Sequence, residues 1–141
     1  MNRLLIDTDV ILDFFFDRAP FAEHSAQIIG LCEAQTVNGY VSPVIVSNTY
    51  YLLRQTARHE KVIDSFKQLL SFMHVLQMDK GVVISALNSK FKDFEDALQN
   101  FAATRSSEID VIITRNAKDY SKSQIAVLTP EDFIKSLDLN G

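Results

Sequence analysis

The chain alternates between two hydrophobic patterns along its whole length. Short apolar runs bounded by polar residues are typical of strands that are buried on both faces of a sheet. Between these runs, apolar residues recur every three or four positions, as on the inner face of an amphipathic helix. The runs predict strands at residues 4–6, 36–41, 74–78, 110–114 and 125–128. The helical spacing predicts helices at residues 10–16, 21–34, 43–58, 61–72, 82–89 and 94–104, and a last one from residue 130 onward.

Capping residues mark where several of these helices begin. Ser42 before Pro43 is a strong start signal, because serine caps a helix and proline fits its first position. Asp79 and Asp93 stand where the N-caps of the next helices are expected. Residues 115–123 show neither periodicity and are predicted to form a loop.

Strands that alternate with helices favour a parallel sheet, because parallel neighbours need crossover connections. We therefore expect a three-layer α/β/α fold with a central parallel sheet of about five short strands. The 141 residues suffice for one core, and no repeat or long linker divides them. Residues 1–141 are thus predicted to form a single domain.

The composition is that of a soluble globular protein, with 47% apolar and 23% charged residues. No run of 18 apolar residues is present, so we expect no membrane span. Asp7, Asp9 and Asp13 break the first apolar run, which therefore does not resemble a signal peptide. Cys32 is the only cysteine, so no internal disulfide can form, and a cytoplasmic location is expected.

The net charge of −4 and the pI near 5.3 argue against simple electrostatic binding of nucleic acid. They argue less strongly against a nuclease, because divalent ions held by clustered acids restore positive charge at the site.

Acidic residues recur at predicted strand ends and helix starts. Asp7 ends the first strand, and Asp119 follows the fourth. Asp93 and Asp96 lie in the first turn of a predicted helix. These side chains can converge at the carboxyl edge of one parallel sheet, where ligands bind in such folds. Because clustered carboxylates raise one another's pKa, the cluster calls for Mg²⁺ or Mn²⁺, which prefer oxygen ligands and support phosphodiester hydrolysis.

Each of these acids also has a purely structural interpretation. Asp7 and Asp93 are suited to cap the helices that follow them, and Asp96 favours the helix dipole. Asp119 is suited to cap a turn. From the residues alone, both interpretations stay open.

Other common chemistries find no support in the sequence. His24, His59 and His74 lack the spacing of zinc ligands. Neither a glycine-rich phosphate loop nor a Gly-x-Ser-x-Gly nucleophile elbow is present.

Four segments, taken in order, resemble the motif blocks of one known family. Residues 5–13 are similar to an opening Asp-Thr-Asn followed by an apolar helix. Residues 93–98 and 110–120 resemble the third and fourth blocks, and residues 128–133 resemble the usual ending. Together they span nearly the whole chain and resemble a PIN domain, the fold of many prokaryotic toxin ribonucleases of the VapC type.

The resemblance implies a metal-dependent ribonuclease site. Asp7 and Asp96 would hold Mg²⁺ or Mn²⁺, and Asp119 would complete the ligand set directly or through water. Further oxygen ligands from the same regions would be Asn48, Asp93 and Asn116. Residues implied to contact the RNA substrate are Thr8, Thr114, Arg115 and Asn116.

One position departs from the family pattern. The second acid is usually a glutamate in the helix after the second strand, and Asn48 stands at that place here. Asn116 also replaces an acid of many relatives. An amide oxygen can ligate a metal but brings no charge, so the resemblance leaves two hypotheses open: an active ribonuclease, or a catalytically weakened module that binds RNA or protein.

The resemblance also implies partners. The protein would be the toxin of a toxin–antitoxin pair, held by a protein antitoxin, and would form a homodimer. The apolar stretches 50–53 and 66–72 are the surfaces expected to pair.

Overall fold

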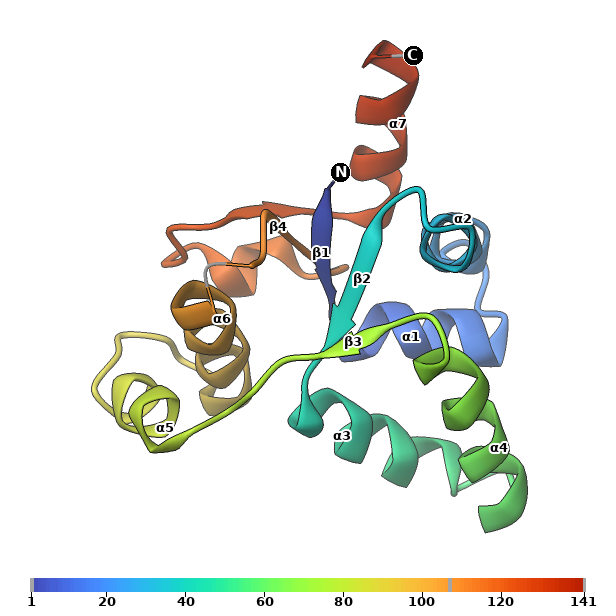
Figure 1. Cartoon of the computed structure of the whole chain (residues 1–141), viewed down its shortest axis with the longest axis horizontal. Coiled ribbons are helices and arrows are strands. Elements are labelled where there is room, and N and C mark those ends of the chain that lie inside the picture. Colours follow the sequence, from blue (N-terminus) through green and yellow to red (C-terminus); the bar gives the residue numbers. More distant parts are fainter. Residues whose placement is uncertain (1, 107, 141) are drawn as a thin grey trace.

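A five-stranded parallel sheet forms the centre of the structure, a computed structural model that describes residues 2–106 and 108–140 (Figure 1). In spatial order its strands are β3 (His74–Val75), β2 (Asn38–Val41), β1 (Arg3–Ile6), β4 (Val111–Ile113) and β5 (Ala126–Leu128). The register places Leu5 of the central strand between Tyr40 and Ile112. The strand β1 is therefore paired on both edges, and the residue after it lies at the middle of the carboxyl edge.

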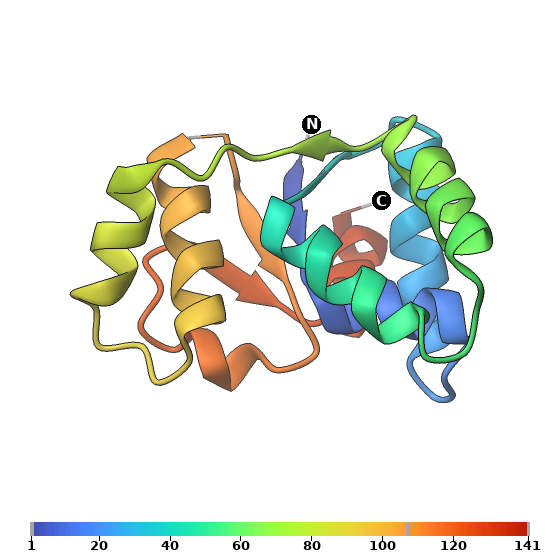
Figure 2. The same cartoon turned by 90° about the horizontal axis from the view of Figure 1, so that it is seen from below.

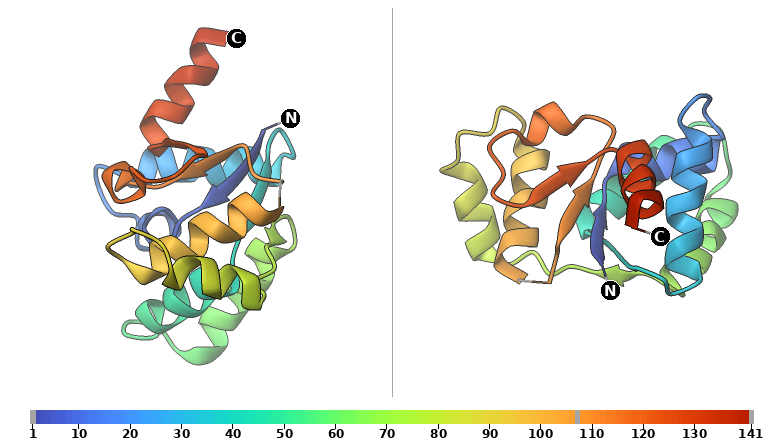
Figure 3. Two further views of the ribbon diagram at one scale, coloured as in Figure 1. Left: turned by 90° about the vertical axis from the view of Figure 1, so that its left-hand side faces the viewer. Right: turned by 90° about the horizontal axis from the view of Figure 1, so that it is seen from above.

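Helices fill the connections and flank the sheet, which confirms the predicted α/β class (Figure 2). They are α1 (Thr8–Phe16), α2 (Ala22–Glu33), α3 (Pro43–Leu53), α4 (His59–Leu70), α5 (Lys80–Leu87), α6 (Phe94–Ser106) and α7 (Pro130–Asn140), with a 3-10 helix, η1 (Ala117–Tyr120). The pair α5 and α6 lies at one end of the molecule, and α1, α2 and α4 lie at the other (Figures 1 and 2). Helix α7 packs on α2 and extends away from the rest of the fold (Figure 3).

The predicted capping residues begin their helices as expected. The hydroxyl of Ser42 accepts a hydrogen bond from the backbone N–H of Ile45 at 3.1 Å. Asp79 accepts one from the backbone N–H of Val82 at 3.0 Å. These caps satisfy backbone donors that have no partner within the helix. None of the helices in the described residues combines the length and the apolar character needed to cross a bilayer.

Two predicted elements end three or more residues earlier in the structure. Helix α3 ends at Leu53 instead of near residue 58, because residues 54–56 are exposed and no side chain there holds the helix to the core. Strand β3 has two residues instead of five, since its partner β2 ends at Val41, where Ser42 starts the next helix.

Two predictions near the carboxyl edge were wrong. Residues 115–123 are not only a loop, because η1 forms within them and buries Tyr120, which is 2% exposed. The apolar spacing of residues 94–104 also predicts that Phe94 lies on the inner face of this helix, but its side chain is 46% exposed. Phe91 instead packs against Phe101 and Tyr120, with ring centroids 6.1 and 6.2 Å away.

The two expected pairing surfaces differ in exposure. In the stretch 66–72, the apolar Phe66 and Leu69 are 6% and 3% exposed and belong to the core, whereas Lys67, Gln68 and Ser71 are exposed. In the stretch 50–53, by contrast, Tyr51 is 69% and Leu52 is 38% exposed.

Gly39 provides a test of how tightly the sheet packs on α2. A Cβ atom at this position would lie 2.6 Å from Sγ of Cys32 and 3.0 Å from Cε of Met73. We expect Gly39→Ala to lower the free energy of unfolding by about 1–3 kcal/mol, as overpacking does. In a Cys32→Ala background, which removes the sulfur, the same substitution should cost clearly less. Urea denaturation of the four proteins measures this coupling, and equal costs in both backgrounds would contradict it.

Candidate active site

Asp7 lies where β1 ends and α1 begins, and its carboxylate joins three segments of the chain. Oδ1 accepts a hydrogen bond from the backbone N–H of Thr8 at 2.8 Å, so Asp7 caps α1 as expected. Oδ2 accepts from the hydroxyl of Thr114 at 3.0 Å and from that of Tyr120 at 3.2 Å. Burial raises the pKa of Asp7, and these hydrogen bonds offset only part of that rise. These hydrogen bonds fix the carboxylate in position, and among the described residues no basic side chain lies within ion-pair distance of it.

A cleft of about 600 Å³ opens beside Asp7, between the starts of α1 and α6, the helix α3 and η1. The acidic residues in its lining are Asp7, Asp9, Asp93, Glu95, Asp96 and Asp119. The acids that the sequence predicted at strand ends and helix starts therefore share one cleft. The remaining lining residues are Thr8, Leu12, Arg18, Asn48, Tyr51, Leu52, Gln99 and Arg115.

The charge of Asp96 is disfavoured by three neighbouring carboxylates. It lies in the first turn of α6, where the carboxylate of Asp93 accepts a hydrogen bond from its backbone N–H at 2.9 Å. Burial, followed by the charges of Asp7, Asp93 and Asp119, raises the pKa of Asp96 to about 7. The four acids are therefore close enough to repel one another.

Asp9 is a cleft residue to which the sequence assigned no role. Its carboxylate accepts hydrogen bonds from the backbone N–H of Arg115 at 3.3 Å and from the amide of Asn116 at 3.1 Å. Burial, followed by the charge of Asp7, raises the pKa of Asp9 to about 6. The signal in the sequence that could have pointed to Asp9 is its spacing, two residues after Asp7 at the start of α1. Asp9 holds the segment after β4 in place.

Two arginines of the cleft are tied to a buried acid. Asp13 is 1% exposed, and its oxygens lie 3.7 Å from Nη1 of Arg18 and 3.5 Å from Nε of Arg115. The guanidinium of Arg115 also lies over the ring of Phe21, 4.2 Å from its centroid. Burial raises the pKa of Asp13, while Arg115 and Arg18 lower it. Arg115 is therefore held at the cleft by an ion pair and an aromatic ring.

Asn48, at the position of the missing acid, contacts an acid from another helix. Its amide Nδ2 donates a hydrogen bond to Oε2 of Glu95 at 2.8 Å, and both residues line the cleft. The hydroxyl of Ser42 donates to Oε1 of Gln99 at 2.5 Å and fixes the start of α3 against α6. The cleft thus contains the carboxylate of Glu95 beside Asn48, although position 48 itself carries an amide.

The residues implied to contact substrate are placed differently from one another. Thr8 and Arg115 line the cleft. Thr114 is fully buried and its hydroxyl is used by Asp7. Asn116 is not among the residues that line the cleft, and its amide donates to Asp9, which does line it.

The donor set fits a hard divalent cation that keeps much of its water. The cleft offers carboxylate and amide oxygens but no sulfur or imidazole. Within residues 2–106 and 108–140, no group of three or more acidic, histidine or cysteine side chains is placed so that it could hold a metal ion. Mg²⁺ is usually held by one or two carboxylates and several waters, so a full protein cage is not required.

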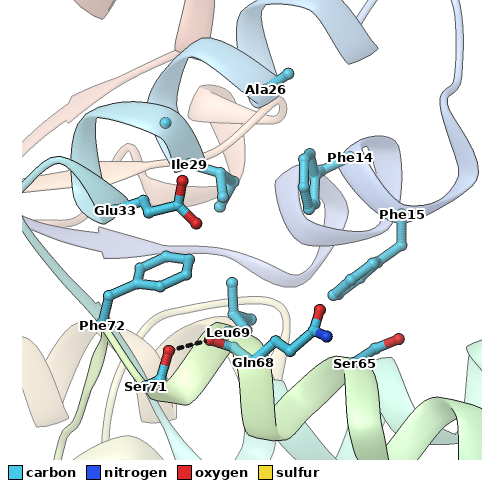
Figure 4. Close-up of a pocket in the computed structure, with 11 residues that line it drawn as sticks. Phe14, Phe15, Ala26, Ile29, Glu33, Ser65, Gln68, Leu69, Ser71 and Phe72 are labelled. Carbon is cyan, nitrogen blue, oxygen red and sulfur yellow. Dashed lines mark hydrogen bonds between the residues drawn. The ribbon is translucent and has the colours of Figure 1, made fainter.

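A second, apolar cavity of about 370 Å³ lies between α1, α2 and α4 (Figure 4). Phe14, Ile29, Leu69 and Phe72 surround it, and Glu33 is its one acidic lining residue. Its chemistry differs from that of the acidic cleft and offers no comparable set of ligands.

The raised pKa of Asp96 makes stability depend on pH. The folded state holds this proton more tightly than the unfolded state, whose pKa is near 3.8. The free energy of unfolding should therefore fall as pH rises from about 4 to about 7. In EDTA, Asp96→Asn should lose less stability than the unaltered protein between pH 5.5 and 8. Thermal unfolding measures this, with the exposed Asp64→Asn as control, and an unchanged pH dependence of Asp96→Asn would contradict it.

Comparison with known proteins relates this arrangement to others. A model of the PIN domain matches residues 3–118. Ribonuclease VapC1 of Aquifex aeolicus (strain VF5) is 27% identical over 137 residues, which cover 94% of this chain and 93% of that protein.

Solved structures of low sequence identity share the fold. One of them is the crystal structure of VapBC2 from Rickettsia felis bound to a DNA fragment from its promoter. A chain of that structure superposes on this chain with a TM-score of 0.67 at 10% identity, and the match covers 90% of this chain and 98% of that one. A chain of VapBC-1 from nontypeable Haemophilus influenzae gives 0.66 at 14% identity, over 92% and 98%. The family model covers most of the chain, including the strand ends that carry Asp7 and Thr114, and the chain belongs to the PIN domain family.

Proposed function

We propose that this protein is a divalent-metal-dependent endoribonuclease that hydrolyses RNA phosphodiester bonds with Mg²⁺ or Mn²⁺. The observation that carries the proposal is the shared cleft of Asp7, Asp96 and Asp119, which come from three distant segments. Ribonucleases of this family generally depend on a divalent metal, and the similarity to Ribonuclease VapC1 of Aquifex aeolicus supports RNA as the substrate class.

In this proposal Asp7 and Asp96 hold the ion, and Asp119 completes the set directly or through water. When bound, the ion would stabilise negative charge on a phosphoryl oxygen and lower the pKa of water. Thr114 and Tyr120 keep the Asp7 carboxylate in one orientation. Burial and the charge of Asp7 raise the pKa of Tyr120, so its hydroxyl stays protonated and able to donate.

The RNA substrate would contact polar side chains that line the cleft. Arg115 is suited to contact a phosphate, because its stacking on Phe21 and its pairing with Asp13 fix its guanidinium before RNA binds. Thr8 lines the same cleft. Asn116 acts as a positioning residue through Asp9.

The pair of Asn48 and Glu95 favours an active enzyme over a module that has lost catalysis. The weakened-module hypothesis was based on the acids that Asn48 and Asn116 replace. Glu95 returns one carboxylate to the cleft beside Asn48. The cleft therefore offers a cation more negative charge than a comparison of position 48 alone with the family pattern implies.

We further propose that the protein acts in the cytoplasm as the toxin of a toxin–antitoxin pair and forms a homodimer. Several structures that share its fold are of VapBC pairs, such as those from Rickettsia felis and Haemophilus influenzae. The exposed Tyr51 and Leu52 are the part of the expected pairing surface that the structure leaves accessible.

Cleavage of RNA should depend on the clustered carboxylates. We expect Asp7→Asn and Asp96→Asn each to lower kcat/KM by more than about 100-fold, beyond the loss that outer partners of a metal cause. The control is Asp64→Asn, an exposed acid on α4 that should cleave like the unaltered protein. Gel assays on single-stranded RNA measure the rates, and circular dichroism verifies the fold. Cleavage by both cleft variants at the unaltered rate would remove the proposed roles.

Binding of the metal should be detectable without activity. Calorimetry is expected to show that the unaltered protein binds Mn²⁺ in the millimolar range or tighter, and that Asp96→Asn binds it at least about tenfold more weakly. Excess EDTA should abolish RNA cleavage, and Mn²⁺ should restore it. No binding at millimolar Mn²⁺, together with no cleavage, would favour the binding-module hypothesis.

A further inference from the structure

A third cavity, of about 290 Å³, adjoins the acidic cleft on the side of η1. It shares Asp93, Asp96 and Asp119 with the cleft, so the two hollows meet at these acids. Its other charged residues are all lysines: Lys90, Lys92, Lys118 and Lys122. We refer to these four as the lysine wall.

The lysine wall concentrates positive charge that the overall composition does not suggest. The net charge is −4, yet four of the eight lysines in the sequence lie at this one cavity. All four are exposed. Within the part of the chain that the structure describes, none of them lies within ion-pair distance of a carboxylate. The arginines of the cleft, Arg18 and Arg115, are by contrast both paired with Asp13.

The backbone beneath the lysine wall is anchored to the site. Phe91, between two of the lysines, packs edge-on against Tyr120, whose hydroxyl donates to Asp7. The backbone N–H of Phe91 also donates to the hydroxyl of Ser89 at 3.3 Å. Lys118 lies in η1, where its carbonyl accepts from the backbone N–H of Ser121 at 3.2 Å. The backbone at Phe91 and Lys118 is therefore held in place beside the acids that share this cavity.

We propose that the lysine wall binds the phosphates of the RNA strand on one side of the cleavage point and leads the strand to the acids. This inference rests on the proposed function, because it assigns the path of that enzyme's substrate. An acidic cleft repels a phosphate chain, and unpaired cations immediately beside it offset that repulsion where the strand must approach. Lysine suits this task, since contacts to phosphate position the strand without reading its sequence.

Salt-dependent binding tests the proposal directly. Two double variants, Lys90→Gln with Lys92→Gln and Lys118→Gln with Lys122→Gln, are made in an Asp7→Asn background that does not cleave. The control is Lys61→Gln with Lys67→Gln on α4, which changes the charge equally outside both hollows. Fluorescence anisotropy with a labelled single-stranded RNA and Mg²⁺ gives Kd at several salt concentrations.

We expect each wall variant to weaken RNA binding by about 10- to 30-fold near 0.1 M salt. The slope of log K against log salt should become shallower by about 0.7 for each phosphate that a lysine no longer neutralises. The control should change Kd less than about twofold. With Asp7 intact, the wall variants should raise KM for cleavage and leave kcat nearly unchanged, since the reacting groups remain.

The outcomes separate this proposal from the proposed function. If the unaltered protein cleaves RNA but the wall variants bind like the control, the lysine wall is not the substrate path and the ribonuclease stands. Equal weakening by the wall and control variants would show a general charge effect and would also overturn the proposal. If the unaltered protein neither binds nor cleaves RNA, the proposed function itself fails.

Discussion

The hydrogen bonds that Asp7 accepts connect the sheet to the cleft. Its carboxylate caps α1 and at the same time accepts from Thr114 at the end of β4 and from Tyr120 in η1. Two of these elements carry another cleft acid, Asp9 in α1 and Asp119 in η1. The position of one carboxylate at the end of the central strand is therefore linked to the positions of Asp9 and Asp119. Any rearrangement that moved Asp7 would also disturb the elements that carry these two acids.

The same arrangement opposes the stability of the fold. Burial raises the pKa of Asp7, and burial and neighbouring acids raise that of Asp96. Elsewhere the chain follows local preferences, as in the cap at Ser42 and the fully buried residues of β1. Departures from such consistency are expected where function requires them. A cation would remove the repulsion, which explains why acids are retained at a place where apolar or amide side chains would stabilise the protein more.

The sequence predicted the features that depend on local chemistry. The strand before Asp7 and the helix starts at Ser42 and Asp79 depend on apolar runs and caps, and all appear in the structure. The end of α3 could not be read from periodicity, because it depends on which side chains reach the core. The choice of Phe91 over Phe94 for the core depends likewise on the path of a loop. The rule that ligands bind at the carboxyl ends of parallel strands predicted that the main acids lie together. It could not predict the contacts of Asp9, because they join segments more than one hundred residues apart.

The departure at Asn48 is understandable once its partner is known. Glu95 lies in the first turn of α6, where the helix dipole favours a negative charge. A glutamate at position 48 would bring a second carboxylate to a site where Asn48 now donates a hydrogen bond at 2.8 Å to Glu95, and the two charges would repel. An amide offers the donor that the carboxylate needs and adds no charge. The two positions are therefore coupled: with glutamate on α6, asparagine is the better residue on α3, and the cleft contains the carboxylate of Glu95 beside it.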